Sequence, residues 1–272
     1  MQFAAELALA KKLAADAGDI MRRYFRSEDI GTVEKSDKTL VTLADTEINT
    51  MVITRVKETF PRHAVHGEEE HFVVENADYT WVCDPVDGTM PFAKGIPIST
   101  FSLALVDREG RSVVGVVYDP NQDRLYEAVR GQGAWLNGKQ ISVSSKAELD
   151  LAYIDQELWI NEQEGVSFSD PKDRLNKQGA KVTTFCSAVL AGCFVAEGVY
   201  EALLFGQSKP EDIAALSVIV EEAGGKVTDL LGREQRYDQK IYGAVVSNGL
   251  LHEQLLAITS SMDYQSTHLK AA

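Results

Sequence analysis

The stretch from Trp81 to Thr89, WVCDPVDGT, joins an apolar segment to two carboxylates, a proline and a glycine. The apolar part favours a strand, whereas Asp is a poor strand residue and Asp-Pro followed by Asp-Gly is typical of a sharp turn. Pro85 stiffens the backbone between the acids, and Gly88 lets a ligand approach the main chain closely. Taken alone, the turn is also typical of a solvated loop. If other acids join it at the mouth of a sheet, it is well placed to hold a divalent cation.

The net charge of the chain limits the kinds of molecule that it is expected to bind. The chain has 272 residues, enough for one large or two closely joined domains, and 41 acidic against 27 basic residues give a net charge of −14. Nucleic acids and anionic membranes need basic surface, so we expect neither as a partner. The sequence has no run of about 18 apolar residues, which predicts that it has no membrane span. An acidic protein also repels an anionic substrate unless bound metal reverses the local field.

Cysteine usage predicts the compartment. The three cysteines, Cys83, Cys186 and Cys193, lack metal-binding spacing, and their odd, sparse set argues against a disulfide framework. A reducing compartment is therefore expected, and we predict a cytoplasmic protein. The N-terminal segment carries Glu6 and has no basic region before its apolar part, so we expect an amphipathic helix there and not a signal peptide.

Hydrophobic periodicity predicts helices followed by an antiparallel sheet in the first half. Apolar residues at helical spacing run from Phe3 to Tyr24, and a capping-box pattern at Thr42–Asp45 begins a second helix. Apolar and β-branched segments predict strands at 100–106, 112–118 and 124–129.

In the second half, strands and helices alternate. Strands are predicted at 151–155, 181–186, 200–205, 226–230 and 242–247. Helices are predicted at 188–197, at 210–223 and from about residue 250, with a long loop at 156–180. We expect an α/β layered protein with an N-terminal α+β half (1–145) and a C-terminal α/β half (146–272) that share one cleft.

Each further acid has an ordinary structural interpretation. Asp212 follows Pro210 at a helix start, where acids complement the helix dipole. Glu68 belongs to a run of three glutamates, which is usually a solvated face. Asp45 can simply complete the capping box with Thr42, and Ser187 can cap the helix behind it.

Read together, these motifs resemble those of the inositol monophosphatase family of magnesium-dependent phosphatases. The family's tryptophan and Asp-Pro-x-Asp-Gly-Thr signature matches Trp81–Thr89, and its Gly-Glu-Glu element matches Gly67–Glu69. The second signature, an aspartate at the start of an Ala-rich helix ending in Glu-Ala-Gly-Gly, matches Asp212–Gly225. A lysine followed by Val-Thr-x-x-Asp is matched by Lys35–Asp45, and the hairpin at 115–138 follows the family pattern. The resemblance covers nearly the whole chain and implies an αβαβα sandwich of stacked helices and sheets.

Three positions depart from the family pattern. Glu211 stands where a tryptophan usually precedes the metal-binding aspartate, and Pro91 replaces an asparagine. Counting back from Asp212 without gaps, Phe205 occupies the position of a glutamate that contacts a sugar hydroxyl in inositol-specific members. The implied metal set is intact, whereas the implied substrate set is altered.

The resemblance implies a site with two Mg²⁺ ions, and room for a third, weaker ion near Glu68. Glu68, Asp84 and the Val86 carbonyl would hold one ion, and Asp84, Asp87 and Asp212 the second. Thr89, paired with Asp45, resembles the couple that orients the attacking water, and Glu68 counts with them as catalytic. The implied substrate contacts are Asp87, Gly88, Thr89, Ser187, Ala188, Phe205 and Asp212. The motifs that carry the four carboxylates have no lysine or arginine interleaved among the acids. Glu68, Asp84, Asp87 and Asp212 could therefore not all stay ionised without a cation.

The expected function is Mg²⁺-dependent hydrolysis of a small phosphomonoester, by two-metal in-line attack of water. We expect myo-inositol 1-phosphate to be hydrolysed, though not as the best substrate. Histidinol phosphate is the main alternative, with its imidazole on Phe205 and its amine near Glu211, followed by sugar phosphates and nucleotide 3′-phosphates. The resemblance also implies a homodimer.

Two other classes of protein are considered. A calcium loop starting at Asp84 is excluded by spacing, because Thr89 and Gly95 stand where glycine and glutamate are needed. A non-catalytic regulatory protein on the same fold stays open, since fold does not determine function.

Overall fold

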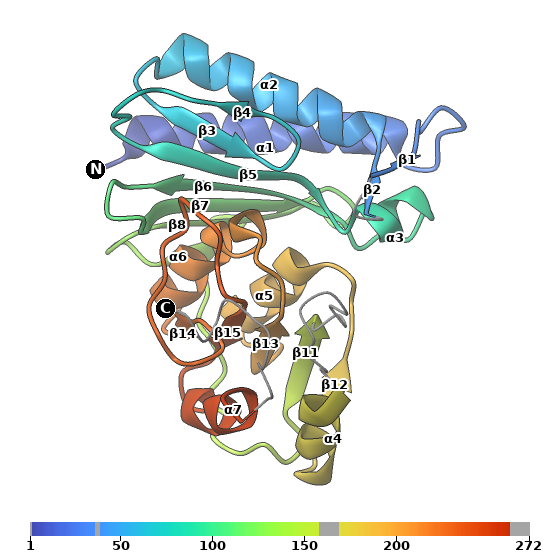
Figure 1. The fold of residues 1–272 in the computed structure, drawn as a ribbon, viewed down its shortest axis with the longest axis vertical. Coiled ribbons are helices and arrows are strands. Elements are labelled where there is room, and N and C mark those ends of the chain that lie inside the picture. Colours follow the sequence, from blue (N-terminus) through green and yellow to red (C-terminus); the bar gives the residue numbers. More distant parts are fainter. Residues whose placement is uncertain (1, 36–38, 158–168, 262–272) are drawn as a thin grey trace.

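A computed structural model describes residues 2–35, 39–157 and 169–261. In this part of the chain, helices and sheets stack in five alternating layers (Figure 1). The confirmed architecture is the αβαβα sandwich that the resemblance implies.

The first sheet contains eight strands in the order β10-β9-β8-β7-β6-β5-β3-β4. Its strands are β3 (Ala64–Gly67), β4 (His71–Phe72), β5 (Thr80–Asp87), β6 (Thr100–Val106), β7 (Ser112–Asp119), β8 (Arg124–Val129), β9 (Ala134–Leu136) and β10 (Lys139–Gln140). Neighbouring strands are antiparallel except β3 and β5, which are parallel. The strands predicted at 100–106, 112–118 and 124–129 are therefore confirmed.

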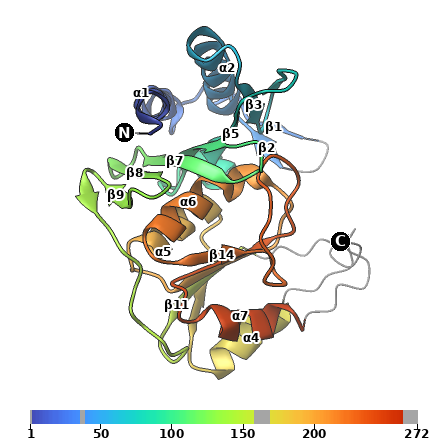
Figure 2. The ribbon, with the colours of Figure 1, turned by 90° about the vertical axis from the view of Figure 1, so that its left-hand side faces the viewer.

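Helices cover both faces of this sheet. The helices α1 (Ala4–Tyr24) and α2 (Leu43–Thr59) lie on one face, and α5 (Ala188–Ala196) and α6 (Ala214–Glu222) on the other (Figure 2). Along β5, Trp81 and Cys83 pack with α1 and α2, whereas Val82 packs with α5 and α6. Successive strand residues point to opposite faces, so a strand covered on both sides is apolar throughout. This explains the unbroken apolar run before Asp84.

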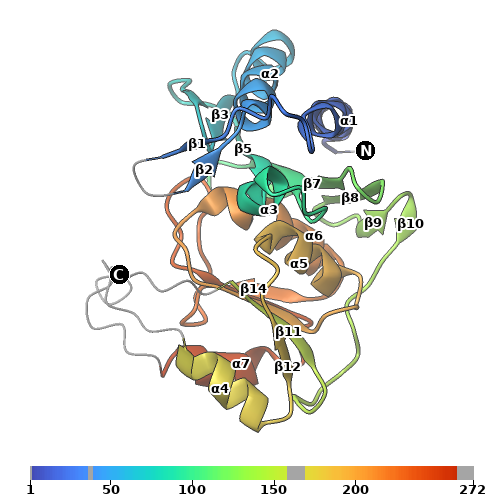
Figure 3. The same cartoon turned by 90° about the vertical axis from the view of Figure 1, so that its right-hand side faces the viewer.

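The second sheet contains five strands in the order β12-β11-β13-β15-β14. They are β11 (Tyr153–Glu157), β12 (Lys181–Thr183), β13 (Ala202–Phe205), β14 (Lys226–Thr228) and β15 (Ala244–Ser247). The strand β11 runs parallel to β12 and β13, while β15 is antiparallel to its neighbours. The helices α4 (Ser169–Lys177) and α7 (His252–Thr259) close the outer face (Figure 3).

Two predicted elements differ in the structure. The segment 156–180 is not a single loop, because β11 continues to Glu157 and α4 occupies Ser169–Lys177; its residues 158–168 lie outside the described part. The helix predicted at 210–223 is divided into a 3-10 turn, Pro210–Asp212, and α6, which begins at Ala214. A two-stranded hairpin, β1 (Val33–Glu34) and β2 (Leu40–Val41), and the short α3 (Thr89–Ala93) complete the elements of the described residues.

None of the helices in the described ranges is both long and apolar enough to cross a membrane.

Candidate active site

Asp84 and Asp87 lie at the end of β5, where its pairing with β6 becomes irregular. Asp84 is paired with Ser102 and Asp87 with Thr100, and the register shifts between the two pairs. An irregularity of this kind redirects side chains at a sheet edge. Asp84 Oδ1 accepts a hydrogen bond from the Val86 amide at 3.0 Å, and both carboxylates are buried. The Asp-Pro-x-Asp segment thus belongs to β5 and is neither the predicted sharp turn nor a solvated loop; the chain turns at Gly88.

Asp212 completes a group of three acids with Asp84 and Asp87. One carboxylate oxygen from each residue lies within 4.8 Å of the others. Burial raises the pKa of Asp84, and the charges of Glu68 and Asp212 raise it further. Burial also raises the pKa of Asp212, with Glu211 as the next contributor. Three carboxylates this close, two of them buried and one half-buried, stay ionised together only with a cation among them, and oxygen ligands suit Mg²⁺. The residues therefore fit a bound divalent metal ion.

Asp87 is held by hydroxyl groups from two different layers. Its Oδ2 accepts hydrogen bonds from Thr100 Oγ1 on β6, at 3.1 Å, and from Ser187 Oγ at the start of α5. Burial raises the pKa of Asp87 to about 6, although these hydrogen bonds oppose the shift. Ser187 stands at the N-cap position of α5, but its side chain makes no cap hydrogen bond there. Its hydroxyl instead joins the second half of the chain to the acids of the first.

Gly88 is required by its backbone and by its neighbours. It has φ 76°, a conformation that L side chains rarely adopt, and a Cβ there would lie 3.2 Å from the Cys186 carbonyl oxygen. The turn therefore passes close to the segment that carries Ser187. Ala188, the first residue of α5, is buried next to it.

Asp45 combines both roles considered for it. Its Oδ2 accepts hydrogen bonds from the Thr42 amide at 2.8 Å and from Thr42 Oγ1 at 2.5 Å, which completes the predicted capping box. Its Oδ1 lies 3.3 Å from Thr89 Oγ1, which also donates to the Val86 carbonyl at 2.9 Å. Burial raises the pKa of Asp45 to about 7. One oxygen therefore caps α2 while the other faces Thr89.

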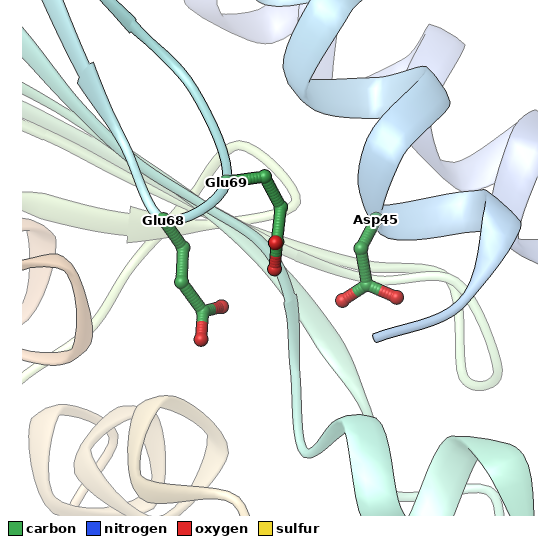
Figure 4. Close-up of side chains that lie close together, drawn as sticks. All are labelled: Asp45, Glu68 and Glu69. Carbon is green, nitrogen blue, oxygen red and sulfur yellow. The ribbon is translucent and has the colours of Figure 1, made fainter. Parts of the chain in front are cut away.

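Glu68 and Glu69 lie in the turn after β3, and their carboxylates reach the same side as that of Asp45 (Figure 4). Oxygens of these three residues lie within 4.8 Å of one another, forming a second acidic group. Asn49 of α2 holds the turn, since its Oδ1 accepts from the Glu69 amide at 3.2 Å. A Cβ on Gly67 would lie 2.2 Å from that Asn49 oxygen, so the close approach requires glycine. Glu68 and Glu69 are therefore not part of a solvated face, whereas Glu70 is exposed.

Two lysines contact the second acidic group, and the sequence motifs did not predict these contacts. Lys209 Nζ lies 2.7 Å from Glu68 Oε1, and Lys35 Nζ lies 2.5 Å from Glu69 Oε1 and 3.6 Å from Glu68 Oε1. Burial lowers the pKa of Lys209, but the charges of Glu68 and Asp212 raise it by more, so its pKa is above the ordinary value. Lys209 stands only three positions before Asp212. The inference that the carboxylates of the site have no positively charged partner in the chain was therefore wrong.

Two residues assigned to the substrate lie elsewhere. Phe205 is only 1% exposed and belongs to the core between the two sheets, so the structure does not support the predicted contact with substrate. Glu211 is buried, with its Oε2 3.9 Å from His66 Nε2. Burial raises the pKa of Glu211. Counting back along the sequence could not show which way the side chains of β13 point.

A buried pair of acids close to Asp87 was also missed. Asp155 and Glu157 lie near the end of β11, and Glu157 Oε1 accepts a hydrogen bond from the Cys186 amide at 2.5 Å. Burial and the charge of Asp155 raise the pKa of Glu157 to about 8. Asp155 ends the strand predicted at 151–155, whereas Glu157 falls in the segment predicted as a loop, so the alternate spacing that puts both acids on one face of β11 was not recognised.

Comparison with known proteins agrees with this geometry. Residues 4–264 match the inositol monophosphatase family. The chain is 34% identical to inositol monophosphatase 1 of Solanum lycopersicum over 96% of each chain. It is 31% identical to a Thermotoga maritima protein named fructose-1,6-bisphosphatase/inositol-1-monophosphatase, over 92% of this chain and 94% of the other. A solved IMPase/NADP phosphatase complexed with Mg²⁺ and phosphate has a TM-score of 0.81 at 26% identity, covering 92% of this chain and 93% of the other.

The layered fold and the buried carboxylates at its centre define a metal-binding phosphatase. The chain belongs to the inositol monophosphatase family, and it is a phosphoric monoester hydrolase. Members of this family generally depend on Mg²⁺.

Proposed function

We propose that this protein hydrolyses a small phosphomonoester by in-line attack of water, with two Mg²⁺ ions in the active site. The observation that carries the proposal is the group formed by the buried Asp84 and Asp87 and the half-buried Asp212, with one carboxylate oxygen from each within 4.8 Å of the others. These residues, with Glu68 and the Val86 carbonyl, would hold the ions. Bound Mg²⁺ supplies Lewis-acid stabilisation of the phosphoryl oxygens and lowers the pKa of the attacking water.

The protein's own groups then have separate tasks. Thr89 accepts a hydrogen bond from the attacking water and passes its own hydroxyl hydrogen bond to Asp45, which orients a lone pair of the water toward phosphorus. The amides of Gly88 and Thr89 face the phosphate oxygens. Ser187 and Thr100 fix Asp87, so that this carboxylate keeps its orientation while the bond between phosphorus and the leaving oxygen breaks.

For the substrate, we propose a small polyol or amino-alcohol phosphate. Because Phe205 is buried in the core, it supports no preference for histidinol phosphate, and Glu211 faces His66 instead of an amine. On β11, Glu157 reaches the segment before α5 through the Cys186 amide, while Asp155 accepts a hydrogen bond from Thr183 Oγ1 of β12. Glu157, with its raised pKa, holds a proton at neutral pH and can donate a hydrogen bond to a substrate hydroxyl.

A panel of phosphomonoesters tests the proposal. We would measure phosphate release from myo-inositol 1-phosphate, histidinol phosphate, fructose 1,6-bisphosphate and a nucleotide 3′-phosphate, with Mg²⁺ and with excess chelator. We expect chelation to abolish turnover and Glu157→Gln to raise KM for the best polyol substrate more than it lowers kcat. If no ester is hydrolysed above the rate of Asp87→Asn, the regulatory alternative replaces the enzyme proposal.

The oligomeric state and the cellular compartment expected from the sequence stay proposals. We infer a cytoplasmic homodimer, and light scattering of the purified protein would give its mass in solution. A monomer across the working concentration range would contradict the dimer.

A further inference from the structure

Lys209 lies between the two acidic groups of the site. Its Nζ is 2.7 Å from Glu68 Oε1, and the charges of Glu68, Asp212 and Asp84 all favour its protonated form. The side chain is 31% exposed, against 12% for Glu68, so the ion pair is largely removed from water. An ammonium in this place acts as a fixed positive charge within a cluster of carboxylates.

The backbone around Lys209 is built to hold it there. Pro210 begins the 3-10 turn that ends at Asp212, so one short segment supplies both the ammonium and a metal-binding carboxylate. The two residues before Lys209 are held through their carbonyl groups. The Ser208 carbonyl accepts a hydrogen bond from the Ile241 amide at 3.2 Å, and the Gln207 carbonyl accepts one from the Gly243 amide at 3.1 Å. The position of Lys209 is therefore determined by the fold and does not depend on a free surface side chain.

Two ammonium groups neutralise most of the charge of the second acidic group without a metal ion, and leave it one carboxylate in excess. Asp45, Glu68 and Glu69 supply the carboxylates, while Lys209 and Lys35 supply two ammonium groups in direct contact with Glu68 and Glu69. A divalent ion bound between these acids would have to displace an ammonium or lie beside it, and like charges at that distance repel. Glu68 retains its second oxygen for an ion held together with Asp84.

We infer that Lys209 is a positioning residue that replaces a metal ion next to Glu68, so that this chain binds two divalent ions and not three. The inference rests on the proposed two-metal function and specifies how this chain sets the number of ions. Lys209 orients Glu68 toward the metals through the contact to its Oε1. Removing the Lys209 ammonium leaves three carboxylates against the single ammonium of Lys35, an excess of two negative charges that a third divalent ion can then neutralise.

The number of bound ions tests the inference directly, using Mn²⁺ as the probe and electron paramagnetic resonance to measure free Mn²⁺. We compare the wild-type chain with Lys209→Met, Lys209→Arg and the control Lys226→Met. Lys226 is a matched lysine on the exposed surface, where its ammonium pairs with Glu253 of α7 and not with the acids of the site. We expect two ions in the wild type, in Lys209→Arg and in Lys226→Met, and three in Lys209→Met.

Each outcome decides a different point. Two ions in both the wild type and Lys209→Met, with unchanged affinities, overturn the role of Lys209 but leave the two-metal proposal intact. Three ions in the wild type also overturn it. Absence of Mn²⁺ binding to the wild type overturns the proposed function, and the inference with it.

Melting temperatures provide a second readout and detect variants that fail to fold. Without metal, Lys209→Met should melt below the wild type, because unbalanced carboxylates repel one another. Its gain in melting temperature with Mg²⁺ should exceed that of the wild type, since an additional ion binds only the folded state. If Lys209→Met cannot be purified folded, Lys209→Gln in Mg²⁺-containing buffer serves the same comparison. Equal gains in all variants would contradict the inference.

Discussion

The two hydrogen-bonding roles of Asp45 can be separated by one substitution. Asp45 Oδ2 caps α2 through Thr42, while Oδ1 faces Thr89 at 3.3 Å. Asp45→Asn keeps the size of the side chain and one oxygen that can accept the Thr42 amide. The new amide group presents N–H to Thr89 in place of a charged acceptor, so it cannot take over the orientation of the attacking water.

The expected magnitudes differ for the two roles. Weakening an N-terminal cap costs about 1 kcal/mol of folding free energy, and removing a buried carboxylate offsets part of this cost. Loss of a positioned acid–base partner lowers turnover by about 100-fold or more. A factor of 100 corresponds to about 2.7 kcal/mol of barrier. We therefore expect kcat to fall steeply in Asp45→Asn while the free energy of unfolding changes by about 1 kcal/mol or less.

Two further variants form a matched pair for this test. Thr42→Val removes the hydroxyl that contacts the capping oxygen, and Thr89→Val removes the one on the opposite oxygen. Urea unfolding should detect mainly the first, and kcat at saturating substrate and Mg²⁺ mainly the second; Thr89→Ser should keep most activity. If Asp45→Asn retains wild-type kcat, or if kcat and stability fall in parallel in all variants, Asp45 is only a cap.

Three other predictions address the metal site, pH dependence and the core. Asp87→Asn removes a ligand charge and should lower turnover at least about 100-fold, and activity that survives both this change and chelation would refute the two-metal proposal. His252 is buried between Ser247 and Thr228, and burial lowers its pKa from 6.5 to about 4. In the unfolded chain this histidine binds a proton more readily than in the folded protein, so protonation favours unfolding. The stabilising contribution of neutral His252 is therefore complete above pH 6.5 and is lost as the pH falls toward 4. We expect on the order of 3 kcal/mol less acid destabilisation in His252→Gln than in the wild type, measured as the difference between their unfolding free energies across this range. Phe205→Leu should cost about 2 kcal/mol of stability through lost core packing. Its relative kcat/KM values for inositol 1-phosphate and histidinol phosphate should be unchanged, and a switch in preference would restore a substrate role for Phe205.

The features that the sequence predicted well depend on neighbours along the chain. The capping box at Thr42 and Asp45 needs contacts three residues apart, and the strands β6 to β8 follow from local apolar patterns. The metal-binding acids were predicted because each motif is long and local, and the structure brings Asp84, Asp87 and Asp212 together. The division near residue 145 stays a prediction.

The features that were missed depend on contacts between distant segments. Lys209 meets Glu68 across 141 positions, and Ser187 meets Asp87 across 100, so neither contact has a local signature. A lysine three residues before an acid reads as an ordinary surface charge until the fold places it among carboxylates. Charge balance within the site therefore could not be judged from the motifs alone.

The error at Phe205 also shows where the polar end of the substrate site lies. Phe205 on β13 is paired in parallel register with Glu157 on β11, and Leu203 is paired with Asp155. Paired residues on adjacent strands point to the same face, so both acids lie on the face on which Phe205 packs toward α5. The carboxyl ends of parallel strands are a common place for ligands in α/β sheets. The strand β13 thus offers Phe205 where a carboxylate that binds a substrate hydroxyl was expected. The neighbouring strand β11 brings the Glu157 carboxyl group to the Cys186 amide, one residue from Ser187. Selectivity for the alcohol part of the substrate is therefore better sought in the pair Asp155 and Glu157 than in the position that an ungapped count identifies.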